Sequence, residues 1–111
     1  MNPHPAPPCF ARHAFGLAAL IAFSSPVLAN KALAEKQGCL GCHATATKLV
    51  GPAFQEVAAK YAGDAGAVAA LSQSIRNGGS GKWGEIPMPP QKQVSEADAK
   101  KLARWILDGA K

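Results

Sequence analysis

Apolar residues recur at intervals of three and four along much of the chain, which is the spacing of helices that bury one face. The pattern predicts four helices in a single small domain: residues 30–37, 53–62, 65–76 and a last helix between Ser95 and Gly109. The expected inner-face residues are Leu33, Phe54, Val57, Tyr61, Val68, Leu71, Ile75, Leu102, Trp105 and Ile106. The glycine-rich turn 77–81 and the proline-rich loop 82–91 show no strand alternation, so the predicted fold class is all-α.

Polar and glycine residues mark the ends of these helices. Ser95 is a predicted N-cap with Asp98 three residues later, as in a capping box, and Asp64 is the predicted cap of the third helix. Gly38 is expected to end the first helix, although it could equally be small because backbone passes close to a cofactor.

The first 29 residues have the pattern of a cleaved secretory signal peptide. Arg12 and His13 precede an apolar run, residues 14–23, and Val27-Leu28-Ala29 offers small or apolar residues at the cleavage position. The alternative is a membrane anchor, but the run is well short of the roughly 20 apolar residues that span a bilayer. We therefore predict a periplasmic protein with its mature domain at residues 30–111 and no membrane anchor after cleavage.

Residues Cys39-Leu40-Gly41-Cys42-His43 form a C-x-x-C-H run, which is typical of c-type haem attachment. Two thiols one helical turn apart can each bond to a vinyl group on one porphyrin edge, and the histidine that follows can ligate the iron. After residue 29 the chain holds one histidine, one methionine and this cysteine pair, too few ligands for a structural zinc site. We predict one covalently attached haem c.

The second axial ligand is predicted to be Met88, in Ile86-Pro87-Met88-Pro89-Pro90. Its flanking prolines fix φ and remove backbone donors, so the segment is a stiff arm able to hold a thioether at a set distance. The carbonyl of Pro52 is placed to accept the His43 Nδ1 proton. Trp83 either donates its indole N–H to a haem propionate or simply packs.

Beyond C-x-x-C-H, the sequence contains Val50-Gly51-Pro52-Ala53-Phe54, Trp83-Gly84-x-Ile86-Pro87-Met88-Pro89-Pro90 and, near the end, Ala103-Arg104-Trp105. In this order they resemble the small bacterial class I cytochromes c of the c-551/c-552 type, over nearly all of residues 30–111. The resemblance implies four to five short helices wrapped around one covalently bound haem c.

The same resemblance assigns the site residue by residue. Cys39 and Cys42 would hold the porphyrin, His43 and Met88 would be the axial ligands, and Trp83 would bond a propionate. Pro52 would orient the histidine, and Phe54 and Ile75 would line the pocket.

Three positions depart from the family pattern. Ser74 stands where some relatives have a propionate-binding arginine, which predicts a different propionate environment. Gln91 stands where an asparagine often bonds the methionine sulfur, which leaves that bond in doubt. Residues 31–37 lack an aromatic residue, so contact with the last helix must depend on Leu33 and Trp105.

The resemblance implies a soluble monomeric electron carrier rather than an enzyme. Expected redox partners are a membrane quinol–cytochrome c reductase upstream and a nitrite reductase, terminal oxidase or cytochrome c peroxidase downstream; a permanently bound subunit of a larger reductase stays possible. The alternative function is a haem-based sensor or small peroxidase with a displaceable Met88, which would need a distal acid–base residue.

Charge is modestly basic, with 12 Lys and Arg against 7 Asp and Glu, a net +5 that becomes about +4 if Arg12 leaves with the leader. Lys36, Lys48, Lys82 and Lys92 lie near the haem-contacting segments. They either steer the protein to acidic partner surfaces or simply keep it soluble. Nucleic acid is not an expected partner, since the charge is modest and the protein is exported.

About 80 mature residues make a thin core, which a covalently held porphyrin would enlarge. We therefore expect the protein without haem to be largely unfolded. Circular dichroism of a haem-free Cys39→Ala/Cys42→Ala variant checks this, and a near-native helical spectrum would contradict it.

Overall fold

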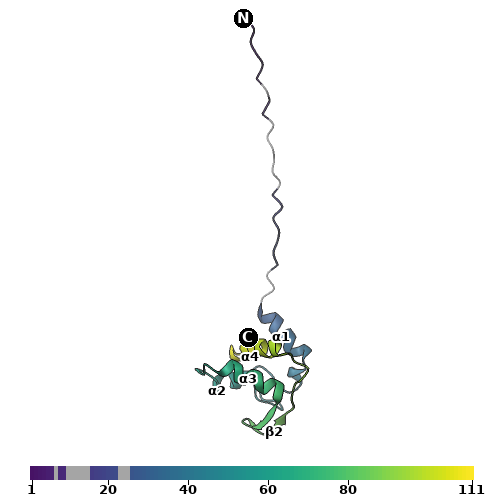
Figure 1. The fold of residues 1–111 in the computed structure, drawn as a ribbon, viewed down its shortest axis with the longest axis vertical. Coiled ribbons are helices and arrows are strands. Elements are labelled where there is room, and N and C mark those ends of the chain that lie inside the picture. Colours follow the sequence, from purple (N-terminus) through teal and green to yellow (C-terminus); the bar gives the residue numbers. More distant parts are fainter. Residues whose placement is uncertain (7, 10–15, 23–25) are drawn as a thin grey trace.

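The computed structural model describes residues 1–6, 8–9, 16–22 and 26–111. Arg12 and His13, on which the signal-peptide prediction depends, lie outside the described residues, so that prediction stays open. The helical body extends from residue 26 to the C-terminus (Figure 1).

Four α-helices and one short 3₁₀ turn make up most of this body. They are α1 (Pro26–Lys36), η1 (Cys39–Gly41), α2 (Phe54–Lys60), α3 (Ala67–Asn77) and α4 (Glu96–Leu107). The predicted helical fold class is confirmed, and each predicted helix is present. The largest difference is at α1, which begins four residues earlier than expected, in the segment assigned to the leader.

Local interactions explain where the helices begin and end. The Ser95 hydroxyl accepts a hydrogen bond from the Asp98 backbone N–H at 3.1 Å, so the predicted N-cap of α4 is confirmed. Gly38 follows α1 with φ 77°, a left-handed conformation that glycine adopts without strain. The predicted Asp64 cap of α3 was wrong, because the helix begins at Ala67, two residues later than expected, and its N-cap is Gly66; the Asp64 carboxylate accepts from the Gly66 N–H at 2.8 Å, in a turn that precedes the helix.

A small antiparallel hairpin joins α3 to α4, so the prediction that the chain contains no strand was wrong. Strand β1 (Gly79–Gly81) pairs with β2 (Gly84–Met88), with Gly79 opposite Met88. The hairpin escaped prediction because four of its eight strand residues are glycine or proline, and the strands lack the alternating β-branched pattern that marks strands.

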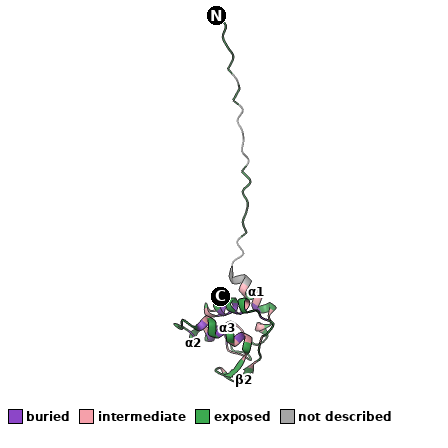
Figure 2. Ribbon diagram, in the orientation of Figure 1, coloured by how far each residue is buried: buried purple, intermediate pink, exposed green. Residues whose placement is uncertain are grey.

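Helix α4 is the centre of the core, since α1, α2 and α3 all pack against it. Figure 2 shows the buried positions along the inner faces of the helices. The predicted inner faces of α2 and α4 are buried, and so are Leu71 and Ile75 of α3, while Val68 is only partly buried. In α1 the residue that enters the core is Ala34, whereas Leu33 is partly buried beside it.

None of the helices in the described part of the chain is long and apolar enough to cross a membrane.

The Ser95 cap gives a direct stability test. Ser95→Ala removes the acceptor for the Asp98 N–H and should lower the free energy of unfolding by about 1 kcal/mol. Ser95→Asp is the control, because it keeps an acceptor at the cap. Urea unfolding of the holoprotein measures both, and equal midpoints for alanine and aspartate would contradict the assignment.

Candidate haem-binding site

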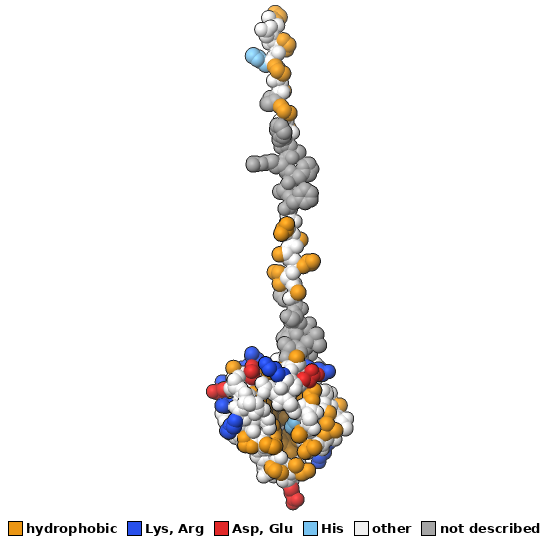
Figure 3. All heavy atoms as spheres, turned by 90° about the vertical axis from the view of Figure 1, so that its right-hand side faces the viewer, with side chains coloured by type: hydrophobic (Ala, Val, Ile, Leu, Met, Phe, Trp, Pro, Cys, Tyr) orange, Lys and Arg blue, Asp and Glu red, His pale blue; other side chains and the backbone are white. Residues whose placement is uncertain are grey.

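A largely apolar cleft of about 300 Å³ opens on one side of the body. Figure 3 shows the hollow, with hydrophobic atoms along its walls and a histidine visible within it. All eight predicted site residues line this one cleft: Cys39, Cys42, His43, Pro52, Phe54, Ile75, Trp83 and Met88. Elements far apart in sequence therefore meet here.

The cysteine pair lies on and just after the 3₁₀ turn η1. The backbone N–H groups of Cys42 and His43 both donate to the Cys39 carbonyl, at 3.2 and 3.0 Å, so the three side chains are fixed within one tight turn. Both thiols are free; Cys39 is half-buried and Cys42 is exposed. Burial raises the pKa of the Cys39 thiol, and the nearby Cys42 raises it further, so Cys39 stays protonated at neutral pH.

A hydrogen bond determines which nitrogen of His43 is available. His43 Nδ1 lies 2.8 Å from the carbonyl oxygen of Pro52. A carbonyl only accepts, so Nδ1 must carry the proton and Nε2 of the neutral ring keeps its lone pair. The ring is thus prepared to ligate a metal through Nε2, with a partner that orients it.

Gly51 makes room for this imidazole. A Cβ atom at position 51 would lie 2.8 Å from His43 Nδ1 and 2.9 Å from Nε2, and closer still to Cε1. The Gly51 N–H also donates to the Cys42 carbonyl at 2.8 Å, which joins the loop to the attachment turn. Gly51 had no predicted role, although its place directly before Pro52 in the motif Val50-Gly51-Pro52-Ala53-Phe54 was the available signal.

Phe54 connects the site to the core. Its ring stacks on His43 with centroids 5.2 Å apart and planes 16° from parallel. The same ring meets Trp105 of α4 edge-on at 5.4 Å. Trp105 is buried, and its indole N–H donates to the Lys111 carbonyl at 3.1 Å, so it packs helix against helix as predicted.

The hairpin and its surroundings hold Met88. Gly78, with φ 65°, packs so closely against the methionine segment that a Cβ there would lie 2.8 Å from Pro90 N and would also overlap the Met88 carbonyl. The Gln91 N–H donates to the Ile75 carbonyl of α3 at 3.1 Å. The C-terminal end of the arm is thereby held against the end of α3. Gly78 was another residue to which the sequence analysis gave no role.

The two polar positions that depart from the family pattern are engaged locally. The Ser74 hydroxyl donates to the Ala70 carbonyl of its own helix at 3.1 Å. The Gln91 side-chain amide donates to the Pro89 carbonyl at 2.9 Å. Ser74 thus bonds within its own helix, and Gln91 stabilises the proline arm from within.

The residues present fit a haem. An apolar cleft, two free thiols one turn apart, an imidazole with Nε2 available and a thioether on a braced arm are the groups that covalent attachment and axial ligation require. Gly51 and Gly78 keep two side-chain volumes clear beside the candidate ligands. The fold and site thus define a small, mainly helical haem protein.

Comparison with known proteins agrees with the assignment of a small, mainly helical haem protein. The family model for cytochrome c matches residues 27–110. Cytochrome c-552 of Hydrogenobacter thermophilus is 50% identical over 84% of this chain and 94% of that protein. Cytochrome c-551 of Azotobacter vinelandii is 59% identical over 68% of this chain and 90% of its own length. The crystal structure of Nitrosomonas europaea cytochrome c552 superposes with a TM-score of 0.69 at 52% identity, covering 70% of this chain and 96% of the other.

The chain therefore belongs to the cytochrome c family. It is a small class I cytochrome c of the c-551/c-552 kind, with one covalently attached haem c, and its family serves electron transport.

Gly51 provides a test of the His43 pocket. Gly51→Ala places a methyl group against the imidazole and should displace the ring, lowering haem loading and the thermal midpoint of the holoprotein. Gly66→Ala is the control, because a Cβ there meets only Asp64 Oδ1 at an ordinary 3.4 Å. Haem content per polypeptide and thermal melts measure both; equal behaviour of the two variants would contradict the crowding.

Proposed function

We propose that this protein is a periplasmic electron carrier whose haem iron is held by His43 and Met88. The observation that carries the proposal is that the fold holds the side chains of both proposed ligands, His43 and Met88, in position in one cleft. His43 is oriented by the Pro52 carbonyl, and Met88 lies on a hairpin tied to α3, in the same cleft. A site with both axial positions filled from the protein transfers electrons and has no open position for a substrate.

A bound haem c supplies a one-electron ferric/ferrous couple. The protein's part is to attach it through Cys39 and Cys42, to keep Nε2 of His43 unprotonated, and to exclude water with apolar walls. The soft thioether of Met88 favours the ferrous state and so raises the reduction potential relative to bis-histidine ligation. None of these tasks requires a large conformational change, which suits repeated electron transfer.

The predicted leader and the family membership support a proposal for location and partners. Export across the inner membrane would remove residues 1–29 and leave a monomeric carrier in the periplasm. It would accept electrons from a quinol–cytochrome c reductase and pass them to a nitrite reductase, a terminal oxidase or a cytochrome c peroxidase.

The alternative, a sensor or small peroxidase, requires an open iron and a distal acid–base group. Glu85 is the one carboxylate among the described residues that line the cleft, and it lies on the exposed hairpin. Nothing in the described lining therefore favours this alternative over the carrier.

Replacement of Met88 tests the proposal. The wild-type ferrous protein should not bind CO, whereas Met88→Ala should bind it readily. The variant's reduction potential should also fall, by on the order of 100 mV within the roughly 0.8 V range that axial ligands control. Optical CO titration and redox titration are the measurements.

Leu49→Ala is the matched control, since it also removes a large apolar side chain, and Leu49 is 49% exposed and is not among the residues that line the cleft. It should keep the wild-type potential and remain inert to CO. Ready CO binding by the wild-type protein would overturn the proposal and favour the sensor or peroxidase.

A further inference from the structure

Two lysines meet an aromatic pair at the edge of the cleft. Lys60, the last residue of α2, places its Nζ 4.3 Å from the centre of the Trp83 ring and donates to the Lys82 carbonyl at 2.8 Å. Lys82 places its Nζ 4.2 Å from the centre of the Tyr61 ring and donates to the Tyr61 hydroxyl. Tyr61, Lys82 and Trp83 all line the cleft. Cation–π contacts and hydrogen bonds thus hold both ammonium groups beside it.

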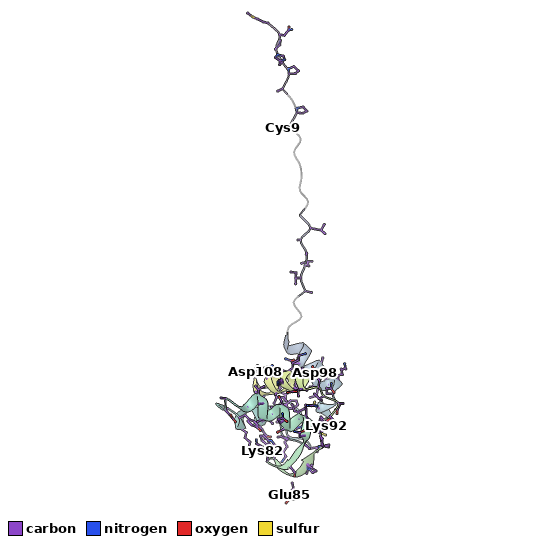
Figure 4. All side chains as sticks on the ribbon, viewed as in Figure 1. Cys9, Lys82, Glu85, Lys92, Asp98 and Asp108 are labelled. Atoms are coloured by element: carbon purple, nitrogen blue, oxygen red, sulfur yellow. The ribbon has the colours of Figure 1, made fainter. Side chains whose placement is uncertain are left out.

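Neither ammonium group has a carboxylate partner within the described part of the chain. The ion pairs found there join Lys31 to Glu35, Lys100 to Glu96 and Lys101 to Asp98. Glu85, the acidic residue nearest to Lys82 in sequence, points away from the body at the tip of the hairpin (Figure 4). An ammonium has three donors, and Tyr61 accepts one from Lys82, so that group can still bind an anion.

We propose that Lys82, supported by Lys60 and Tyr61, binds a carboxylate of the haem propionates. This inference rests on the proposed function, because it concerns the same haem in the same cleft. A carboxylate here would complete the cluster, since it supplies the negative charge that two adjacent lysines lack. Ser74 does not compete for it, because its hydroxyl already donates to the Ala70 carbonyl.

Lys82 is favoured over the other lysine that lines the cleft, Lys48. Contacts to the ring and the hydroxyl of Tyr61 fix the Lys82 ammonium in place, and Tyr61 is itself only 6% exposed. Lys48 is exposed on the loop after the attachment turn, and no ion pair or side-chain hydrogen bond fixes it in the described structure. A charge held in position stabilises a carboxylate at a smaller entropic cost than a free side chain does.

The consequence is measurable as a pH dependence of the reduction potential. An ionised propionate stabilises the ferric iron, so the potential falls with rising pH through the range where the propionic acid ionises. A neighbouring ammonium favours the carboxylate and moves this step to lower pH. The other charged or titratable groups around the cluster are Lys60 at the end of α2, Tyr61 directly after it, Glu85 from β2 and, across the lining, Lys48 and His43.

The experiment is a redox titration of the holoprotein between about pH 4 and 9. Lys82→Gln should move the step to higher pH by about one unit. This is the lower end of the effect of a close opposite charge, and it is chosen because water screens the exposed Lys82. Lys82→Arg should keep the step near its wild-type position. Lys100→Gln makes the same change of net charge on α4, outside the cleft lining, and should leave the step unmoved.

An unmoved step in Lys82→Gln, or an equal shift in Lys100→Gln, would overturn the inference. If the step stays and the variant instead loses salt-dependent reaction with an acidic redox partner, the lysines serve docking and the inference is likewise wrong. Ready CO binding by the reduced wild-type protein would mark failure of the carrier proposal separately, because it reports the iron's open position and not the propionate.

Discussion

The hydrogen bond from His43 Nδ1 to the Pro52 carbonyl is the constraint on which the site depends. It fixes the tautomer, which leaves Nε2 free, and it fixes the plane of the ring. Gly51 is needed because any side chain there would occupy the same space as the imidazole. Phe54 stacks on the His43 ring and meets Trp105 of α4 edge-on. The imidazole is thereby packed, through Phe54, onto the helix against which the other three helices pack. The His43 ring and the hydrophobic core are therefore parts of one packed unit.

Met88, the proposed second ligand, is positioned by a different device. A two-stranded hairpin too short to be stable alone is tied to α3 by the close approach of Gly78 and by the bond from Gln91 to Ile75. Prolines on both sides of Met88 limit the backbone further. Such preorganisation suits an electron carrier, whose ligands must keep nearly the same positions in both oxidation states.

Much of this arrangement could be predicted from sequence because the signals were local. Helical spacing predicted α2, α3 and α4, and Ser95 was recognisable as the N-cap of α4. The C-x-x-C-H run and the proline-bounded methionine indicated the candidate ligands. The hairpin could not be predicted, since half of its strand residues are glycine or proline and its strands depend on pairing across the turn. The roles of Gly51 and Gly78 could not be predicted either, because they depend on groups that only the folded chain brings close. These groups are the His43 ring beside Gly51 and the backbone of residues 88–90 beside Gly78. The lysine–aromatic cluster likewise joins α2 to the hairpin, 21 positions apart for Lys82 and Tyr61.

The central claim is that His43 and Met88 together close the iron. The near-infrared absorption spectrum of the purified ferric protein tests it most directly, because a methionine thioether on low-spin ferric iron gives a weak charge-transfer band there. The account predicts a low-spin spectrum that contains this band. A high-spin spectrum, or a low-spin one without the band, would show that Met88 is not a ligand and would contradict the account.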